Sequence, residues 1–175
     1  MSDPGMTPSA RPFVPAGFAV PDGLTQGSFR LEPLGPEHNA PDLAAWGSSI
    51  EHIRSTPGFE GADWPPLAGM TPEQNLGDLR EHADDFAARR GFTYTVLGAQ
   101  DAVIGCVYIY PSADPEFDVD VRSWVRAHVA ELDQELRVVV SDWLGRCWPF
   151  ERIRYARAVT PRPVRPPRRS PGAGP

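Results

Sequence analysis

Polar and apolar side chains alternate strictly between residues 117 and 126. Asp118, Asp120, Arg122, Trp124 and Arg126 fall on one side of this segment, and the residues between them fall on the other. Such alternation is typical of a strand that buries one face. The polar row must then be solvated, paired or lining a cavity. Carboxylates that line a cavity can exchange protons with a reacting group, so this row is the first candidate for chemistry.

A purely structural role for the same row remains open. In this alternative, Asp118 or Asp120 pairs with Arg122 and Arg126 on a solvated face, between positions i and i+2 or across strands. An exposed ion pair of this kind contributes little to stability. Whether the row does chemistry therefore depends on the elements that surround it.

The segments around residues 117–126 predict a sheet that ends in a parallel crossover. Residues 92–97 and 103–110 read as two strands, and the tight turn at 98–101 joins them into a hairpin. A further turn at residues 111–115 leads into the alternating segment. An amphipathic helix follows at about 129–146, and residues 148–155 alternate again as a last strand. A strand–helix–strand unit places its two strands parallel, with a right-handed crossover.

The first part of the chain predicts one strand and two helices. Residues 28–34 alternate as a strand, and a helix follows at about 37–46. Residues 55–69 form a long stretch rich in Gly, Pro and aromatic residues, which we interpret as a packed loop that could cover a site. Thr71, Pro72 and Gln74 then give the capping box and first turn of a second helix, and Gly91 marks its end.

Proline marks the two ends of the chain, and the apolar residues of one domain lie between them. Many of the 21 prolines fall in the first 36 residues or after residue 159. Chain ends of this composition bury too little apolar surface to fold. We therefore expect disorder in residues 1–27, a folded α+β domain in residues 28–157, and a disordered Pro/Arg-rich tail in residues 158–175.

The charge distribution excludes some classes of partner. The whole chain has a net charge of −6, but its last 18 residues hold four arginines and no acid, so residues 1–157 carry −10. Nucleic acid requires cationic contacts, so we expect no nucleic-acid partner. No apolar run reaches the roughly 18 residues of a membrane span, and no signal-peptide pattern is present. We expect no membrane partner and a cytoplasmic protein.

Cysteine and histidine give no metal site. Cys106 and Cys147 are interpreted as small core residues of a reduced protein. The four histidines share no spacing typical of metal ligands, so we expect no metal.

The order of the predicted elements resembles the GNAT acyltransferases, which use acetyl-CoA. Three local features carry this resemblance: the hairpin, the Val-Ile-Gly start of the strand at residue 103, and the Trp-Pro-Phe entry to the last strand at residue 148. The run at residues 121–126 is also similar to a small group of actinobacterial GNAT-like proteins. The resemblance covers residues 28–157. It implies a mixed, mostly antiparallel sheet with flanking helices, shortened at its C-terminal end relative to the family.

This resemblance implies an N-acetyltransferase that uses acetyl-CoA as co-substrate. Its acceptor would be a small amine or a peptide amine, and the acidic body would favour a cationic acceptor. Asp120 or Asp118 would take the amine proton, directly or through water. Tyr108 or Tyr110, on the neighbouring strand, would protonate the leaving thiolate.

The resemblance also implies a set of cofactor-binding residues around the end of the same strand. Val125 and neighbouring backbone amides would polarise the thioester, and Arg126 and His128 would help to hold the diphosphate. Trp124 belongs to this set by position, although it could also pack simply or form a wall for the acceptor.

The chain departs from the family at the turn that grips the diphosphate. The family pattern there is Arg/Gln-x-x-Gly-x-Gly/Ala, but residues 126–135 contain no glycine and include Glu131, Asp133 and Glu135. Carboxylates repel a diphosphate, and side chains block close backbone approach. The chain is therefore an atypical member by sequence, and a catalytically inactive GNAT-like binding or interaction module is the alternative function. A sheet edge left open by the last strand would also allow a homodimer.

Overall fold

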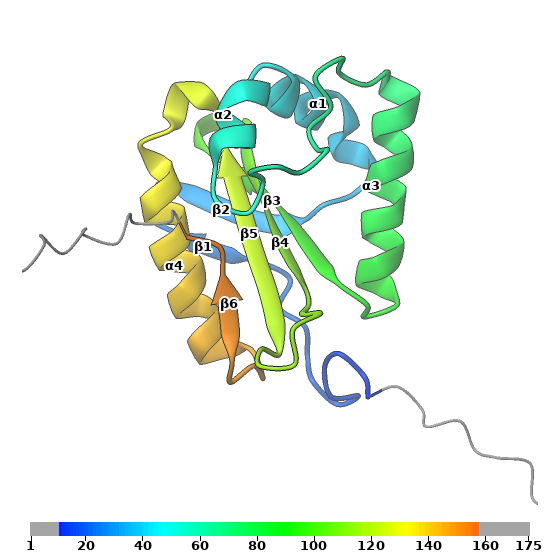
Figure 1. Ribbon diagram of the computed structural model, residues 1–175, viewed down its shortest axis with the longest axis vertical. Helices are drawn as coiled ribbons and strands as arrows, with labels where there is room; N and C mark the ends of the chain where they lie inside the picture. The colour runs from blue at the N-terminus through cyan, green and yellow to red at the C-terminus, as the bar shows by residue number, and fades with distance from the viewer. Residues whose placement is uncertain (1–10, 158–175) are drawn as a thin grey trace, which may run out of the picture.

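Six strands form one sheet in the computed structural model, which describes residues 11–157 (Figure 1). The strands follow each other across the sheet in chain order, and all neighbours are antiparallel except β5 and β6. The strands are β1 (Leu24–Gln26), β2 (Phe29–Pro33), β3 (Phe92–Leu97), β4 (Val103–Pro111), β5 (Val119–Val125) and β6 (Ile153–Tyr155). The helices are α1 (Asn39–Gly47), α2 (Ile50–Ser55), α3 (Pro72–Ala87) and α4 (Leu132–Cys147). This architecture confirms the predicted mixed, mostly antiparallel α+β fold.

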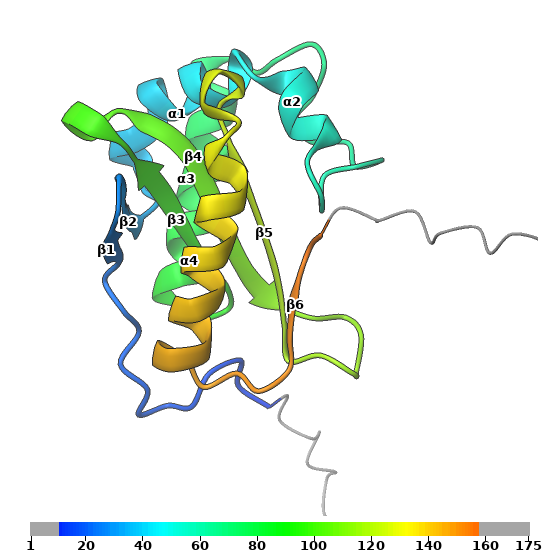
Figure 2. The same ribbon diagram turned by 90° about the vertical axis from the view of Figure 1, so that its left-hand side faces the viewer.

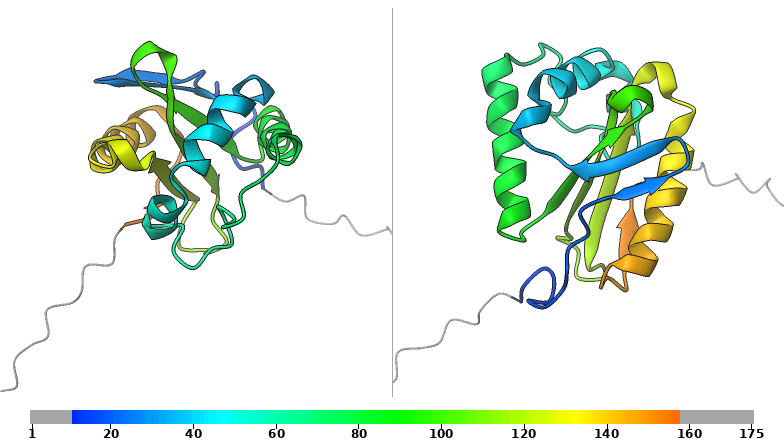
Figure 3. Two further views of the ribbon diagram at one scale, coloured as in Figure 1. Left: turned by 90° about the horizontal axis from the view of Figure 1, so that it is seen from above. Right: turned by 180° about the vertical axis from the view of Figure 1, so that it is seen from behind.

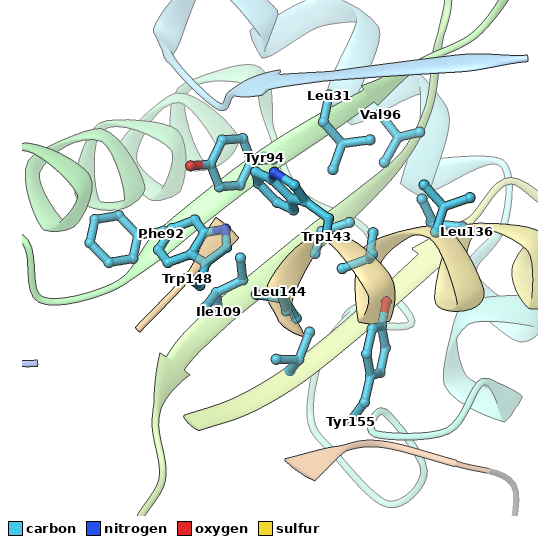
Figure 4. Packing of buried hydrophobic residues seen from close by; sticks show 14 of the residues in the cluster. Leu31, Phe92, Tyr94, Val96, Ile109, Leu136, Trp143, Leu144, Trp148 and Tyr155 are labelled. Carbon is cyan, nitrogen blue, oxygen red and sulfur yellow. The ribbon is translucent and has the colours of Figure 1, made fainter. Parts of the chain in front are cut away.

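Helices cover both faces of the sheet. α4 lies on one face, and α1, α2 and α3 lie on the other (Figure 3). On the α4 face, Tyr94, Trp143 and Trp148 make edge-to-face aromatic contacts with ring centroids 5.3 to 6.4 Å apart (Figure 4). On the opposite face, Trp46 and Trp124 are almost completely buried. Because both faces are covered, every residue of β3 is buried, whatever its polarity.

The start of α3 is fixed by the predicted capping box. Thr71 Oγ1 accepts a hydrogen bond from the Gln74 backbone N–H at 3.3 Å, and Gln74 Oε1 accepts one from the Thr71 N–H at 2.9 Å. Pro72 occupies the first helical position, where no intrahelical N–H is needed. This local signal fixes the residue at which α3 begins. The polar face of the same helix lines a groove over the sheet.

The crossover from β5 to β6 follows the predicted order, but its elements are shorter. The helix begins at Leu132, because residues 127–129 form a separate turn of 3-10 helix. β6 contains only the last three residues of the predicted strand and pairs in parallel with Val119 to Val121 of β5 (Figure 2). Trp148 and Phe150 stack in the core at 5.7 Å between ring centroids, and Pro149 has no N–H for a strand ladder.

The expectation of disorder for residues 1–27 is wrong for residues 11–27. Val14 is 2% exposed, and β1 pairs with β2 as a hairpin. Arg89 donates hydrogen bonds to the carbonyl oxygens of Pro15 and Phe18 at 2.7 and 2.9 Å. Tyr94 donates its hydroxyl proton to the Pro21 carbonyl oxygen at 2.7 Å. A few apolar residues and these hydrogen bonds hold the segment on the core, although its average composition is that of a disordered end.

The disorder expected for residues 1–10 and 158–175 concerns residues outside the described range. Within residues 11–157, no helix combines the length and the apolar character needed to cross a membrane.

Candidate active site

A groove runs over the face of the sheet that α1, α2 and α3 cover. Three adjoining cavities of about 390, 370 and 200 Å³ share Tyr108 and Arg122 in their walls. These two residues are direct partners across β4 and β5, so the two central strands form the floor. Gly58, in the loop after α2, lines one side, and Asp120 lies at the end near β6. We call these joined cavities the sheet-face groove.

α3 turns a polar, mostly acidic face toward the sheet-face groove. Asp78, Glu81, His82 and Asp85 line it, and spacings of three and four residues place them on one side of the helix. Burial raises the pKa of Asp78 and lowers the pKa of His82. The imidazole is therefore neutral at pH 7, and a ligand cation would meet carboxylates beside a neutral proton acceptor.

Hydrogen bonds fix the orientation of His82. Its Nδ1 lies 2.9 Å from the Tyr110 hydroxyl oxygen and 3.1 Å from Thr93 Oγ1. Tyr110 donates its single hydroxyl proton to Asp85 Oδ2 at 3.1 Å, so the ring nitrogen must donate to the Tyr110 oxygen. This assigns the proton to Nδ1 and leaves a lone pair on Nε2. An imidazole oriented by a second group in this way is suited to act as a general base.

Tyr108 places a buried hydroxyl group on the floor of the sheet-face groove. It accepts a hydrogen bond from Trp124 Nε1 at 3.2 Å, and burial raises its pKa well above the usual value. The hydroxyl therefore keeps its proton and can donate it. Trp124 is fully buried, with its ring centroid 6.2 Å from that of Trp64. Its side chain thus packs beside the groove, on the same face of the sheet, and has no exposed surface to offer a cofactor.

Arginines in β6 and directly before it hold the two aspartates that the sequence places as bases. Asp118 pairs with Arg152 at 2.6 Å, and the hydrogen bonds from this arginine lower the pKa of Asp118 to about 2. Asp120 pairs with Arg154 at 2.6 and 2.7 Å, which lowers its pKa as well. Carboxylates with lowered pKa values are weak bases at neutral pH. The geometry supports the ion-pair alternative, with Arg152 and Arg154 as the partners in place of Arg122 and Arg126.

A buried carboxyl group lines the smallest of the three cavities that form the groove. Asp42 is 4% exposed and accepts a hydrogen bond from Asn75 Nδ2 at 3.2 Å. Asn75 in turn accepts one from Trp46 Nε1 at 2.9 Å, so the carboxyl group belongs to a network between α1 and α3. Burial raises the pKa of Asp42 to about 6.

Replacing Asp42 by asparagine is expected to stabilise the protein near pH 8. The folded-state pKa of about 6 exceeds the usual 3.8, so the wild-type stability is full below about pH 4 and falls as the pH rises through 6. This loss amounts to about 3 kcal/mol. An amide keeps the acceptor for Asn75 and does not ionise. Urea unfolding of both proteins at pH 4 and 8 measures the difference, and an equal gain or loss at both pH values would contradict this account.

A second cavity of about 380 Å³ lies at the free edge of β5. β6 pairs with β5 only from Val119 to Val121, so Ser123 faces this cavity. The start of α4 and the residues after α2 close it. Its lining residues are Thr56, Pro57, Ser123, Ala130, Glu131, Asp133, Gln134 and Arg137. We call it the edge cavity; Pro57 lines it, and the next residue, Gly58, lines the sheet-face groove.

The turn before α4 already uses its own backbone N–H groups. Val129, Ala130 and Asp133 donate to carbonyl oxygens three residues earlier, at 3.0, 3.3 and 3.1 Å. Ala127 donates to Ser49 Oγ at 3.0 Å. A diphosphate at a helix N-terminus needs free N–H groups that it can approach closely, and this turn lacks the glycine that would permit such an approach. The residues present therefore do not fit the diphosphate of acetyl-CoA in the mode typical of the GNAT family.

Side chains of this chain also occupy the position expected for the thioester. Asp133 pairs with His52 at 2.9 Å and receives a hydrogen bond from the Val125 backbone. Arg126 Nη2 lies 3.2 Å from Ser48 Oγ, and His128 is exposed. Neither Arg126 nor His128 lines the edge cavity, so the structure does not bring the predicted cofactor-binding residues together in one site.

Arg137 contributes a positive charge to the lining of the edge cavity. Its guanidinium carbon lies 4.7 Å from the centroid of the Tyr155 ring, and it hydrogen-bonds to the Ala156 carbonyl oxygen. Arg137 Nη1 is buried without a hydrogen-bond partner among residues 11–157. An unpaired buried donor of this kind suits a phosphate or carboxylate. Sequence reasoning missed it, because an arginine on a helix is ordinarily a solvated residue.

The described residues 11–157 contain no group of three or more His, Cys, Asp or Glu side chains arranged to hold a metal ion.

Comparison with known proteins identifies the fold. No protein-family model and no curated protein sequence matches the chain. The ribosomal-protein-S5-alanine acetyltransferase from Vibrio fischeri matches in structure with a TM-score of 0.54 and 14% identity, over 70% of this chain and 66% of that one. RimL, a ribosomal L7/L12 alpha-N-protein acetyltransferase, matches with a TM-score of 0.52 and 12% identity, over 76% and 70% of the two chains. This chain spans about two thirds of the length of these proteins, and it has the fold of the GNAT acetyltransferases.

Proposed function

We propose that this protein is an N-acetyltransferase that moves an acetyl group from acetyl-CoA to an amine in the sheet-face groove. One observation carries the proposal: consecutive residues of β5 line the groove and the edge cavity. Val121 and Arg122 line the groove, and Ser123 lines the edge cavity. A two-substrate reaction needs two sites whose ligands touch at one point, and this strand edge provides such a point.

The groove residues supply the proton transfers of the reaction. Nε2 of His82 takes a proton from the acceptor ammonium, and the freed amine attacks the carbonyl carbon of the thioester. The C–N bond forms, the C–S bond breaks, and Tyr108 gives its proton to the departing thiolate. The nitrogen loses its second proton as the amide forms, and this proton restores the Tyr108 hydroxyl. Asp85 and Tyr110 position His82 and do not exchange protons with the substrate themselves. These roles replace the assignment of Asp118 and Asp120 as bases.

The edge cavity would hold the acyl donor along β5. Ser123 lies at the free strand edge, where a pantetheine-like arm can run beside the backbone, and Arg137 offers a cation to a phosphate. The Val125 N–H reaches a thioester only after Asp133 leaves it. The donor therefore binds by contacts that differ from the usual glycine-rich turn.

A binding module without catalysis is the second candidate function. The occupied backbone N–H groups before α4 and the carboxylates of Glu131 and Asp133 favour it, because they oppose a diphosphate. In that case the sheet-face groove would hold an amine or a peptide amine and nothing would be transferred to it.

Calorimetric titration of the purified protein with acetyl-CoA, and with free CoA as a control, distinguishes the two candidates. Micromolar binding, followed by acetylated products in a mass-spectrometric screen of small amines and peptides, supports the transferase. No heat from a protein that circular dichroism shows to be folded would contradict the transferase. Arg137→Gln is expected to weaken acetyl-CoA binding, whereas Arg146→Gln on the outer face of α4 leaves it unchanged, since Arg146 pairs with exposed Asp142 and lines no part of the edge cavity among the described residues.

A further inference from the structure

Arg122 stands at the centre of the sheet-face groove. It is the residue that, together with Tyr108, lines all three of the joined cavities. It projects from β5 toward the face covered by α1, α2 and α3, directly across from Tyr108 on β4. Any ligand that fills the groove must therefore contact this guanidinium group.

The surroundings of Arg122 hold it in place without neutralising it. Its guanidinium carbon lies 4.7 Å from the Phe59 ring centroid and 5.3 Å from the Tyr108 ring centroid. One nitrogen, Nη1, donates to the Gly58 carbonyl oxygen at 3.3 Å. Aromatic faces and a carbonyl group orient a guanidinium but leave its charge uncompensated.

Other arginines of the same sheet have carboxylate partners, and Arg122 has none within residues 11–157. Arg30 pairs with Glu32 and Asp101, and Arg154 pairs with Asp114 and Asp120. No salt bridge reaches Arg122 among these described residues, and Gly58 is its one hydrogen-bond acceptor there. Its Nε and Nη2 donors are thus left for a ligand, in the geometry that receives a carboxylate through two parallel hydrogen bonds.

The opposite wall of the groove has the complementary charge. Asp78 of α3 lines two of the cavities that Arg122 lines, and Glu81 and Asp85 line the larger of these two. Carboxylates on one wall attract an ammonium group, and an unpaired guanidinium on the floor attracts a carboxylate. A ligand that carries both groups a few bonds apart satisfies both walls at once.

We propose that the sheet-face groove binds a free amino acid, whose carboxylate pairs with Arg122 and whose ammonium group faces the acidic side of α3. The two parts of the groove that contain Asp78 and Arg122 together have volumes of about 200 and 370 Å³, which suits a small molecule and not a folded partner. That this ligand is the acceptor rests on the proposed function; its binding does not. In that role, its ammonium nitrogen lies on the side of the groove that holds His82.

Binding is tested without acetyl-CoA, so that the result does not depend on transfer. The full-length protein is titrated with the standard free amino acids, with the amide of each, and with the amine that lacks the carboxyl group. At least one amino acid is expected to bind, and about 10-fold to 100-fold more tightly than its amide, the range for a charge-assisted hydrogen-bonded pair. Equal affinity of an amino acid and its amide, or no binding by any amino acid at millimolar concentration, would overturn the proposal.

Variants of Arg122 test whether this residue causes the preference for an amino acid over its amide. Arg122→Gln is expected to remove the preference for the carboxylate, and Arg122→Lys to retain a part of it, because a lysine keeps the charge but not the fork of donors. Arg146→Gln serves as the matched control for a lost arginine, and melting curves verify that each variant is folded. A preference that persists in Arg122→Gln would contradict the assignment.

The binding experiment and the transfer assay test the two proposals separately. Amino-acid binding without acetyl transfer supports this inference and contradicts the transferase. Acetyl transfer to amines with no preference for a carboxylate supports the transferase and overturns this inference.

Discussion

Replacing His82 by asparagine is expected to lower the rate of acetyl transfer about 100-fold to 10,000-fold, the range for loss of a general base. Asparagine has a similar size and can still hydrogen-bond to Tyr110, but it cannot accept a proton from an ammonium group. The wild-type rate should rise with pH through the pKa of His82, which burial lowers from 6.5, and should level off above it. Steady-state rates across pH for both proteins measure the effect.

Asp118→Asn is the control for this prediction. Asp118 lies in an ion pair with Arg152 and has no place in the proposed proton transfers, so its rate of transfer should stay near that of the wild type. A large loss in Asp118→Asn together with an unchanged rate in His82→Asn would return the role of base to the aspartate. Melting curves distinguish either loss from unfolding.

His82 is a candidate site residue that the sequence alone could not identify. The start of the same helix was predicted correctly, because the capping box at Thr71 and Gln74 is a local signal that depends on three neighbouring positions. Its end was not, since α3 ends at Ala87 and the sequence marks Gly91. Its polar residues carry no such signal. Asp78, His82 and Asp85 have the spacing of any solvated helix face, and only the packing of α3 over β4 places them beside Tyr110.

The partners of the two aspartates could not be predicted for a related reason. Alternation within residues 117–126 places Asp118 and Asp120 on one side of a strand, and the structure confirms that strand as β5. The arginines that meet them lie in β6 and directly before it, more than thirty residues later. Which arginine faces which aspartate depends on the register of β5 against β6, and no local pattern fixes that register.

The average composition of the N-terminal segment predicted disorder wrongly, because a few individual side chains determine whether the segment packs on the core. Residues 11–23 are rich in proline, glycine and alanine, which is typical of a disordered end. Yet Phe13 stacks between Phe92 and Phe150, with ring centroids 5.7 and 5.1 Å away. Burial of a few such side chains outweighs the poor propensity of the rest, so the segment completes the core beside the end of α4.

The close approach of β4 and β5 leads to the prediction with the largest expected effect on stability. A Cβ atom at Gly105 would lie 2.3 Å from the Trp124 carbonyl oxygen and 3.2 Å from the Val125 Cα atom. Both neighbours are backbone atoms of a central strand, so they cannot rotate away. Gly105→Ala is therefore expected to lower the free energy of unfolding by about 3 kcal/mol or more, as overpacking at a rigid site does.

The helical glycine Gly145 provides a matched control, since a Cβ atom there meets nothing within 4 Å. Gly145→Ala should stabilise α4 by about 0.5–1 kcal/mol, and urea unfolding of the two variants measures both changes. Similar effects of the two substitutions would show that β4 and β5 can separate at little cost. Because the same pair of strands holds Tyr108 opposite Arg122, a rigid contact at Gly105 also keeps the floor of the sheet-face groove in a fixed geometry. Gly105→Ala protein that remains folded should therefore lose ligand affinity as well as stability.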